Sequence, residues 1–484
     1  MFKILFHKEI AENIHNYRFL LALVLCLVII PLGFTVSQKD YTARRQAYDE
    51  TVRDYDQTRA TVIDLMSNGG AAFRPPSPLG LLSGGVEAVL PNSVETRGFI
   101  TESGAEVSFN NTKRLDNPFM SLFGRLDLTF IVTTVLAVLV MIFTFNAVAG
   151  EKERRTLAQV MANSVPRPTV ITAKMAAGSS LLAAAFLAGM AAGILITVAL
   201  GQNPFAQPGT LAPFAIGTGV SLVFLLVFYN LGLLVSALTR SSVSAMVALL
   251  SVWVALAMIL PKGSIVFAKL ILPVKSQQVM DLEKSQARLQ SDREFYADLG
   301  RLTKSTPGIK DMSMDEYFKA RRAKNQAVEA FEKVQTERKA EFTARLNTEL
   351  DKIDAEFERQ RGRQAALARN FSRLSSVSCF IHVMAELAGT GFAEESAWRE
   401  TRSRFKQMLD REIAPMMRMY TFGNVSYGGD RNLDRKAPAP KLPAEPVPLE
   451  TRLAAVWVDL ALLGIYGILF FAGAYVAFLR YDVR

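Results

Sequence analysis

A run of five charged residues interrupts the most apolar part of the sequence: Glu151, Lys152, Glu153, Arg154 and Arg155. The run follows the apolar stretch 130–145 almost directly, and another apolar stretch begins at residue 175. A charged side chain at the centre of a bilayer costs about 3 kcal/mol or more, so this density of charge cannot lie in hydrocarbon. The chain is therefore expected to leave the membrane after residue 148 and to re-enter it after residue 174. The two glutamates suit the start of a short helix, where the helix dipole is positive.

The other side chains that could do chemistry form no enzyme or metal site. His382 lies beside Cys379 in an apolar patch, and such a lone pair is more often packing than metal ligation. The second cysteine, Cys26, lies in a distant apolar run, so no disulfide framework or Cys-x-x-Cys spacing exists. No Ser/His/Asp or paired-carboxylate pattern occurs, and no Gly-x-x-x-x-Gly-Lys-Ser/Thr loop is present to cradle a phosphate. The chain is therefore not expected to be an enzyme or to bind a cofactor.

A few polar residues fall inside or beside apolar runs. Asp127 and Asp459 are expected near the outer interface, where solvation or pairing with Arg125 is favoured over a role in substrate or proton transfer. Asn146, Asn230 and Lys174 are expected toward the inner ends of spans, with structural roles. These positions mark places where a membrane protein must satisfy a polar group internally.

The composition indicates a multi-span membrane protein, because 50% of the residues are hydrophobic, only 21% are charged, and the apolar residues are clustered. The net charge of +10 does not indicate nucleic acid binding, since basic residues alternate with acidic ones and form no basic tract. A membrane surface and an excess of cations on the cytoplasmic side explain the charge better.

The hydropathy pattern predicts an all-α polytopic protein with six transmembrane helices. Their predicted ranges are 18–36, 126–148, 175–200, 214–238, 243–260 and 453–479. Residues 1–17 read as an amphipathic helix on the inner leaflet, ahead of an uncleaved first span. In the third span, Gly189 and Gly193 permit close helix approach, and packing within one subunit is favoured over a dimer seam.

The distribution of charge predicts the orientation. The loop 149–174 carries five cations, whereas the turn 201–213 carries no charge, so the positive-inside rule places the loop in the cytoplasm. Both termini are then cytoplasmic, together with the turn 239–242 and the tail 480–484. The segments 37–125 and 261–452 fall outside.

The two outer segments predict a mainly helical, coiled-coil-like domain. One seam has tyrosines every seven residues, and the other has apolar residues at spacings of three and four. The seam residues are Tyr41, Tyr48 and Tyr55, and Phe342, Leu346, Leu350, Ile353 and Phe357. We expect the two seams to be natural partners, closing within one chain or between chains.

Shorter features complete the outer segments. Residues 67–118 are rich in loops, with a small hairpin from 94–100 and 106–109. The apolar piece 265–274 is too short to cross a bilayer, which needs about 20 residues, and is expected to lie in the outer interface. Residues 434–448 read as an extended, proline-rich linker.

The run GEKERRTLAQVMANSVPRPTVITAK, with the preceding span and its lead NPFMSLFGRLDL, resembles the permease subunits of type-two ABC transporters, the exporter-like class. In that family a Gly-Glu-x-Glu-x-Gly-Thr-Leu pattern opens a cytoplasmic coupling helix. Gly150, Glu151, Glu153, Thr156 and Leu157 match it here, and Arg155 stands where the family usually has glycine. A weaker match follows in YNLGLLVSALTRSS, residues 229–242. The long segment after span five resembles a subgroup with a large extracytoplasmic insertion, in which Leu-Ala-Gly-Thr, here residues 387–390, follows an apolar patch.

The resemblance implies a set of partners and a location. Cytoplasmic ABC ATPase subunits, which bind the ATP and Mg, would dock on Gly150, Glu151, Glu153, Arg155, Thr156 and Leu157. A second permease subunit, identical or related, would complete the membrane part in the lipid bilayer of a bacterial cytoplasmic (inner) membrane. The chain would then be an exporter or, alternatively, a transmission subunit whose outer domain regulates an extracytoplasmic protein without transport. Without the resemblance, the loop 149–174 would read as an ordinary solvated turn of an anchor or receptor.

Overall fold

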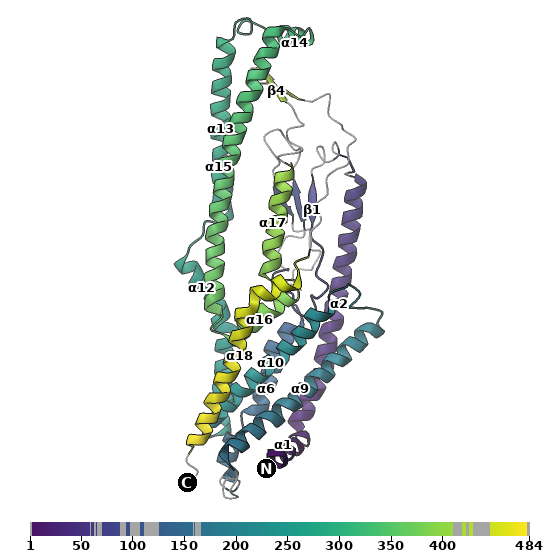
Figure 1. Cartoon of the computed structure of the whole chain (residues 1–484), viewed down its shortest axis with the longest axis vertical. Coiled ribbons are helices and arrows are strands. Elements are labelled where there is room, and N and C mark those ends of the chain that lie inside the picture. The colour runs from purple at the N-terminus through teal and green to yellow at the C-terminus, as the bar shows by residue number, and fades with distance from the viewer. Residues whose placement is uncertain are drawn as a thin grey trace.

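The computed structural model is an elongated, mainly helical molecule, with a bundle of spans at one end and a two-helix hairpin at the other (Figure 1). The first helix and the last turn of the last helix lie at the same end of the bundle, which we name the terminal end. The hairpin rises from the opposite end, which we name the hairpin end. The structure describes residues 2–58, 60–61, 64, 70–87, 93–96, 107–110, 125–157, 159, 166–409, 419–422, 425–428 and 446–481.

Within the described residues, six helical stretches are long and apolar enough to cross a membrane. They are α2 (Tyr17–Thr58); the run α5 (Leu128–Phe130), η1 (Ile131–Leu136), α6 (Ala137–Thr144) and α7 (Ala149–Glu153); α9 (Arg167–Ala199); α10 (Leu211–Leu238); the run α11 (Ser242–Val254), η2 (Ala255–Ile259) and α12 (Leu260–Ile271); and α18 (Leu449–Arg480). This confirms the predicted all-α membrane fold with six spans.

The remaining elements flank the spans. They are α1 (Phe2–Ile14), β1 (Ala71–Phe73), β2 (Ser93–Thr96), β3 (Val107–Asn110), α13 (Gln277–Ser305), α14 (Met314–Arg322), α15 (Gln326–Ser372), α16 (Ser376–Leu387), α17 (Phe392–Met408), β4 (Met419–Phe422) and β5 (Val425–Gly428). Helices α16 and α17 are apolar enough together to count as a seventh candidate span, but they bend by 47° at the break between them. The proline-rich linker lies outside the described residues as far as residue 445, as do residues 158 and 160–165 of the loop after α7.

Small residues bring α2 and α9 close together. A Cβ added to Gly189 would lie 2.7 Å from the carbonyl oxygen of Cys26, and one added to Gly193 would lie 2.9 Å from the ring of Phe34. The two glycines therefore serve close packing within one chain, as the sequence predicted. On the other side of the bundle, α10 packs along α18.

Span five is longer than the sequence predicted. The expected end at residue 260 and the separate interfacial piece 265–274 are replaced by a helix that continues through Ile271. Pro261 lacks an N–H, and its ring would crowd the carbonyl of Ala257, four residues earlier. Ala257 lies in η2, a π-helical segment, and its wider turn accommodates the proline without ending the span.

The hairpin consists of α13 and α15, with α14 at its tip (Figure 1). Phe295 and Leu299 of α13, Tyr317 of α14, and Val328 and Phe331 of α15 form its buried core. Because a helix rises about 1.5 Å per residue, the 47 residues of α15 extend over about 70 Å. The tip therefore lies far from the spans.

The two predicted seams do not meet in this chain, because each has a different partner. Tyr55 stacks edge-on against Phe73 of β1 at 5.2 Å between ring centroids, and its hydroxyl accepts a hydrogen bond of 3.0 Å from the N–H of Ala71. The hydroxyl of Tyr41 accepts from the side chain of Gln207 at 2.9 Å.

Helix α15, which carries the apolar seam, packs instead against α13 and α12. Phe342 lies 5.9 Å from Phe295 of α13 and Leu350 is buried, whereas the other four seam residues, Tyr48, Leu346, Ile353 and Phe357, are half-buried. Helices α13 and α15 lie side by side as an antiparallel pair, with α14 in the connection between them, so α13 covers α15.

A small antiparallel sheet lies beside the part of α2 nearer the hairpin end. The predicted β-hairpin is confirmed by the pairing of β2 with β3, in which Val94 is opposite Phe109 in the register. Strand β1 pairs with the other edge of β2, with Ala72 opposite Val94. The turn between α16 and α17 holds the neighbouring segment 70–87. The hydroxyl of Thr390 donates to the carbonyl of Ser83 at 3.0 Å, and the backbone carbonyl of Thr390 accepts from the N–H of Val86 at 2.8 Å.

Candidate functional site

Helix α7 carries the charged run and lies at the terminal end, directly after span two. Its start is held by the hydroxyl of Ser236 in α10. This hydroxyl accepts from the N–H groups of Val148 and Ala149 at 3.0 and 2.9 Å and donates to the carbonyl of Phe145 at 2.9 Å. The first N–H groups of a helix have no partner within it, so a buried hydroxyl here fixes where α7 begins. Ser236 was not predicted as a site residue, although it lies in the stretch 229–242 that resembles the family.

The charged residues of α7 also bind the turn between spans four and five. The ammonium of Lys152 donates to the carbonyls of Ala237 and Thr239, where α10 ends. The carboxylate of Glu153 accepts from the N–H and the hydroxyl of Ser242, the first residue of α11, at 3.1 and 2.8 Å. These contacts satisfy the last carbonyls of one helix and the first N–H of the next. Helix α7 is thereby attached to two further spans.

Lys174 joins α7 to α1 and α9. Its ammonium lies 2.6 Å from a carboxylate oxygen of Glu151 and 2.8 Å from one of Glu9, and its side chain is only 6% exposed. A buried cation is tolerated because two carboxylates surround it. Helix α1, the charged loop and span three therefore meet at one buried ion cluster.

Arg155 lies just after α7 and has a left-handed backbone, with φ of +57°. Its N–H donates to the carbonyl of Lys152 at 3.1 Å, and the N–H of Arg154 donates to that of Gly150 at 3.0 Å. Both bonds are typical of a helix end, where glycine is favoured because it has no Cβ. The position where Arg155 stands in place of the glycine of the motif is thus the end of α7.

The six predicted docking residues are brought together, but not all face outward. Glu153 and Arg155 are exposed, as is the neighbouring Arg154. Leu157 is 2% exposed and belongs to the core of the span bundle, so it anchors the loop. Gly150 is also buried, and a Cβ there would lie 3.1 Å from the Cβ of Asn146.

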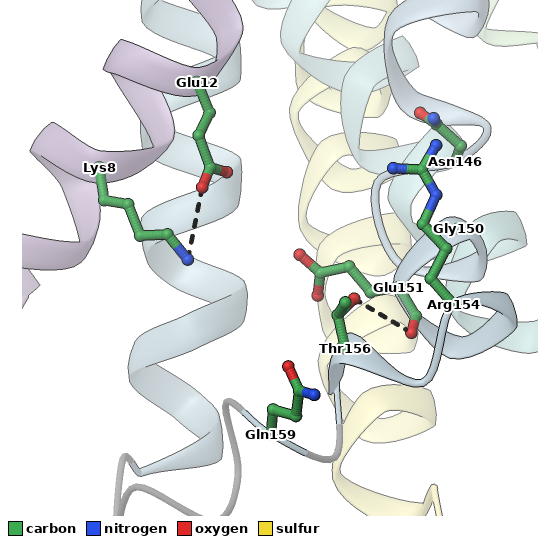
Figure 2. A pocket seen from close by; sticks show the side chains of 8 residues that line it. All are labelled: Lys8, Glu12, Asn146, Gly150, Glu151, Arg154, Thr156 and Gln159. Carbon is green, nitrogen blue, oxygen red and sulfur yellow. Dashed lines mark hydrogen bonds and ion pairs between the residues drawn. The ribbon is translucent and has the colours of Figure 1, made fainter.

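A polar pocket of about 500 Å³ lies between α1 and α7. Figure 2 shows Lys8 and Glu12 of α1 on one side of it and Glu151 and Thr156 on the other. Lys8 and Glu12 form an ion pair of 3.4 Å, and the hydroxyl of Thr156 donates to the carbonyl of Glu151 at 3.4 Å. The pocket therefore offers both charges to a polar group that enters from the terminal end.

In the part of the chain that the structure describes, no three His, Cys, Asp or Glu side chains gather as a metal ion would require. The contacts of α7 are helix caps, ion pairs and carbonyl bonds, which position a surface element. Helix α7 is therefore firmly joined to spans three, four and five.

The sequence matches one known family over nearly its whole length. The model of the ABC-2 family transporter proteins matches residues 4–483. The chain belongs to the ABC-2 transporter family. A search of the curated proteins found no match. The chain is thus a permease subunit of an ABC transporter, a multi-pass membrane component of a family that associates with ATPase subunits.

Two carboxylates of the permease have partners other than the predicted ones. Asp127 is 8% exposed and accepts from the N–H groups of Gly84 and Phe130, so it caps the start of α5. Asp459 is fully buried and binds two arginines of the hairpin and not Arg125. Arg125 instead lies 3.4 Å from Glu87. Both acids are buried, because segments at the hairpin end, which hydropathy alone does not place over the spans, cover them.

Proposed function

We propose that this permease is the membrane part of an ATP-driven exporter, and that a separate ATPase docks on α7 at the terminal end. The observation that carries the proposal is the set of attachments of α7, which join it to spans three, four and five and to α1. A surface helix attached to so many spans transmits a displacement to all of them. An ordinary solvated turn would have no need of these contacts.

The exposed face of α7 offers the contacts for docking. Glu153, Arg154 and Arg155 project from its last turn, and the polar pocket opens beside them between α1 and α7. Charge complementarity at an interface gives specificity and register to a docking partner. The ATPase would supply the ATP and Mg, because the sequence has no phosphate-binding loop.

The docking proposal fixes the orientation. The terminal end is then cytoplasmic, in agreement with the cations of the loop 149–174 and the uncharged turn 201–213. The hairpin projects from the opposite face of a bacterial inner membrane. A second permease subunit, identical or related, would complete the pathway.

The proposal is tested by recovery of the ATPase with the permease from membranes in mild detergent. We expect reversal of one exposed charge, Arg154→Glu, to weaken this recovery by roughly tenfold, equivalent to about 1.4 kcal/mol. Arg322→Glu, the same change at the exposed tip of the hairpin, is the matched control and should leave recovery unchanged. Recovery of the wild-type permease without any ATPase would refute the proposal.

A second function is favoured by the hairpin, whose longer helix, α15, extends over about 70 Å and is attached at its foot to spans five and six. In this alternative, ATP-driven movement of the spans tilts the hairpin, which regulates an extracytoplasmic protein, and nothing crosses the membrane. Stimulation of ATP hydrolysis by an added small molecule, peptide or lipid in proteoliposomes would favour export. Tight binding of an extracytoplasmic protein to the hairpin, with no solute transported, would favour transmission.

A further inference from the structure

Asp459 lies in the first half of α18 and is fully buried, although it belongs to a span. Its carboxylate receives three hydrogen bonds of 2.9 Å from two guanidinium groups, one from Arg369 and two from Arg373. A fourth contact of 3.1 Å comes from the ring of His382. Two-point binding of a carboxylate by an arginine fixes both distance and orientation.

All three partners belong to the outer segment. Arg369 and Arg373 lie at the foot of α15, and His382 lies in α16. Two further bonds join the same elements: Arg369 donates to the carbonyl of Ala455 at 2.8 Å, and the hydroxyl of Tyr466 donates to the carbonyl of Arg373 at 2.9 Å. The foot of α15 is therefore attached to span six along more than two turns of α18.

The other side of the hairpin is continuous with span five. The side chain of Gln364 in α15 donates to the carbonyl of Leu272, at the end of α12, at 2.6 Å. The rings of Phe267 and Phe371 lie 4.1 Å apart between the same two helices. The hydroxyl of Ser375 donates to the carbonyl of Leu256, inside the π-helical segment of span five. Spans five and six therefore both hold the base of the hairpin.

Burial of a carboxylate costs free energy unless the carboxylate is paired, and apolar side chains of similar volume would often hold α15 against α18 with equal or greater stability. An ion pair differs from apolar packing in that it has one geometry and allows little sliding. We propose that Asp459 clamps the hairpin to span six, so that α15 and α18 move as one rigid body. A tilt of roughly 10° at the foot of a helix about 70 Å long would then move the hairpin tip by roughly 12 Å. The clamp concerns the hairpin and holds whether or not an ATPase docks on α7.

The test measures the distance between α15 and α18 in the full chain in lipid nanodiscs. One spin label is placed at Glu337, on the exposed face of α15, and the other at Ile468, which is 71% exposed on α18. Both native cysteines are buried, so the label reacts at the two introduced cysteines. The variants are Asp459→Asn and Arg373→Gln, and the control is Arg345→Gln, which removes an exposed ion pair with Glu341 of the same helix.

We expect a narrow distance distribution in the wild type and one about twofold wider in either clamp variant, with no change in the control. The double variant should be no wider than Asp459→Asn alone, because both changes open the same contact. If Asp459→Asn fails to fold, Arg373→Gln decides, since it leaves the carboxylate paired with Arg369 and His382. A distribution in Arg373→Gln as narrow as in the wild type, or equal widening in the control, would overturn the clamp.

Discussion

Replacing Arg155 by glycine should stabilise the end of α7. A left-handed backbone costs an L-amino acid roughly 1–2 kcal/mol, and Arg155 has φ of +57°. Glycine removes this cost, but it loses more conformational entropy on folding, which offsets roughly 0.5–1 kcal/mol. The net gain is about 0.5–1 kcal/mol, equivalent to a factor of about 2 to 5 in the equilibrium between the closed and open helix end.

Amide hydrogen exchange reports this equilibrium directly, because the N–H groups of Arg154 and residue 155 donate the two bonds that close the helix end. We expect both amides to exchange about 2 to 5 times more slowly in Arg155→Gly. The matched control is Arg154→Gly, one residue earlier, where φ is −83° and glycine brings no relief. There we expect the helix end to lose up to about 1 kcal/mol of stability, so that both amides exchange up to about fivefold faster.

The charge of the side chain changes along with the backbone, so a second variant separates the two effects. Arg155→Ala removes the guanidinium but retains a Cβ and therefore the strained conformation. We expect its exchange rates to stay close to those of the wild type. Slower exchange in Arg155→Ala equal to that in Arg155→Gly would refute the backbone argument, as would no change in Arg155→Gly.

Three further predictions concern stability, measured as the thermal midpoint of the purified chain in nanodiscs. Lys174→Met leaves two carboxylates facing each other without a cation, so we expect the free energy of unfolding to fall by about 3–5 kcal/mol. Lys3→Met, at an exposed site on α1, should leave the midpoint unchanged. Gly189→Leu should force α2 from α9 and reduce the free energy of unfolding by about 1–3 kcal/mol, the usual cost of overpacking, which lowers the midpoint. Gly219→Leu meets open space and should leave the midpoint unchanged. Burial raises the pKa of the Glu87 carboxyl, but a guanidinium at 2.9 Å and other donors outweigh burial and hold the pKa below its usual value. Its folded pKa is therefore lower than its unfolded pKa of about 4.3, so its contribution is complete above that pH and is lost as the pH falls through the folded pKa. The thermal midpoint of Glu87→Gln should therefore fall less than that of the wild type as the pH is lowered. An equal fall in both proteins would contradict the lowered pKa of Glu87.

The sequence was sufficient for features that depend on local composition. The six spans follow from apolar runs, and the loop carrying Glu151 and Glu153 follows from charge that cannot stay in hydrocarbon. The long helix α15 was also predictable, because its apolar residues recur at spacings of three and four. Each of these inferences needs only residues that are close together along the chain.

What the sequence did not supply was the choice of partner. Nothing local to Tyr55 indicates that it faces a small sheet, and nothing local to Asp459 indicates that it binds arginines about ninety residues earlier. Pro261 predicted the end of span five, because proline disfavours the interior of a helix. The π-helical segment before it accommodates the proline ring, so the helix continues. Ser236 looked like one of many small polar residues until the start of α7 was seen to rest on it.

The missed contacts share a physical reason. Within lipid, apolar side chains gain little by leaving one apolar neighbour for another, so hydrophobic burial does not fix how helices are placed relative to each other. Close glycine contacts and buried polar groups must fix that placement, and a buried polar group requires particular partners. The permease has such clusters at both ends of its bundle, around Lys174 where α1 and α7 join the spans and around Asp459 where the hairpin joins them. Both clusters lie where an element outside the spans must move together with them, and a contact that allows little sliding is what such movement requires.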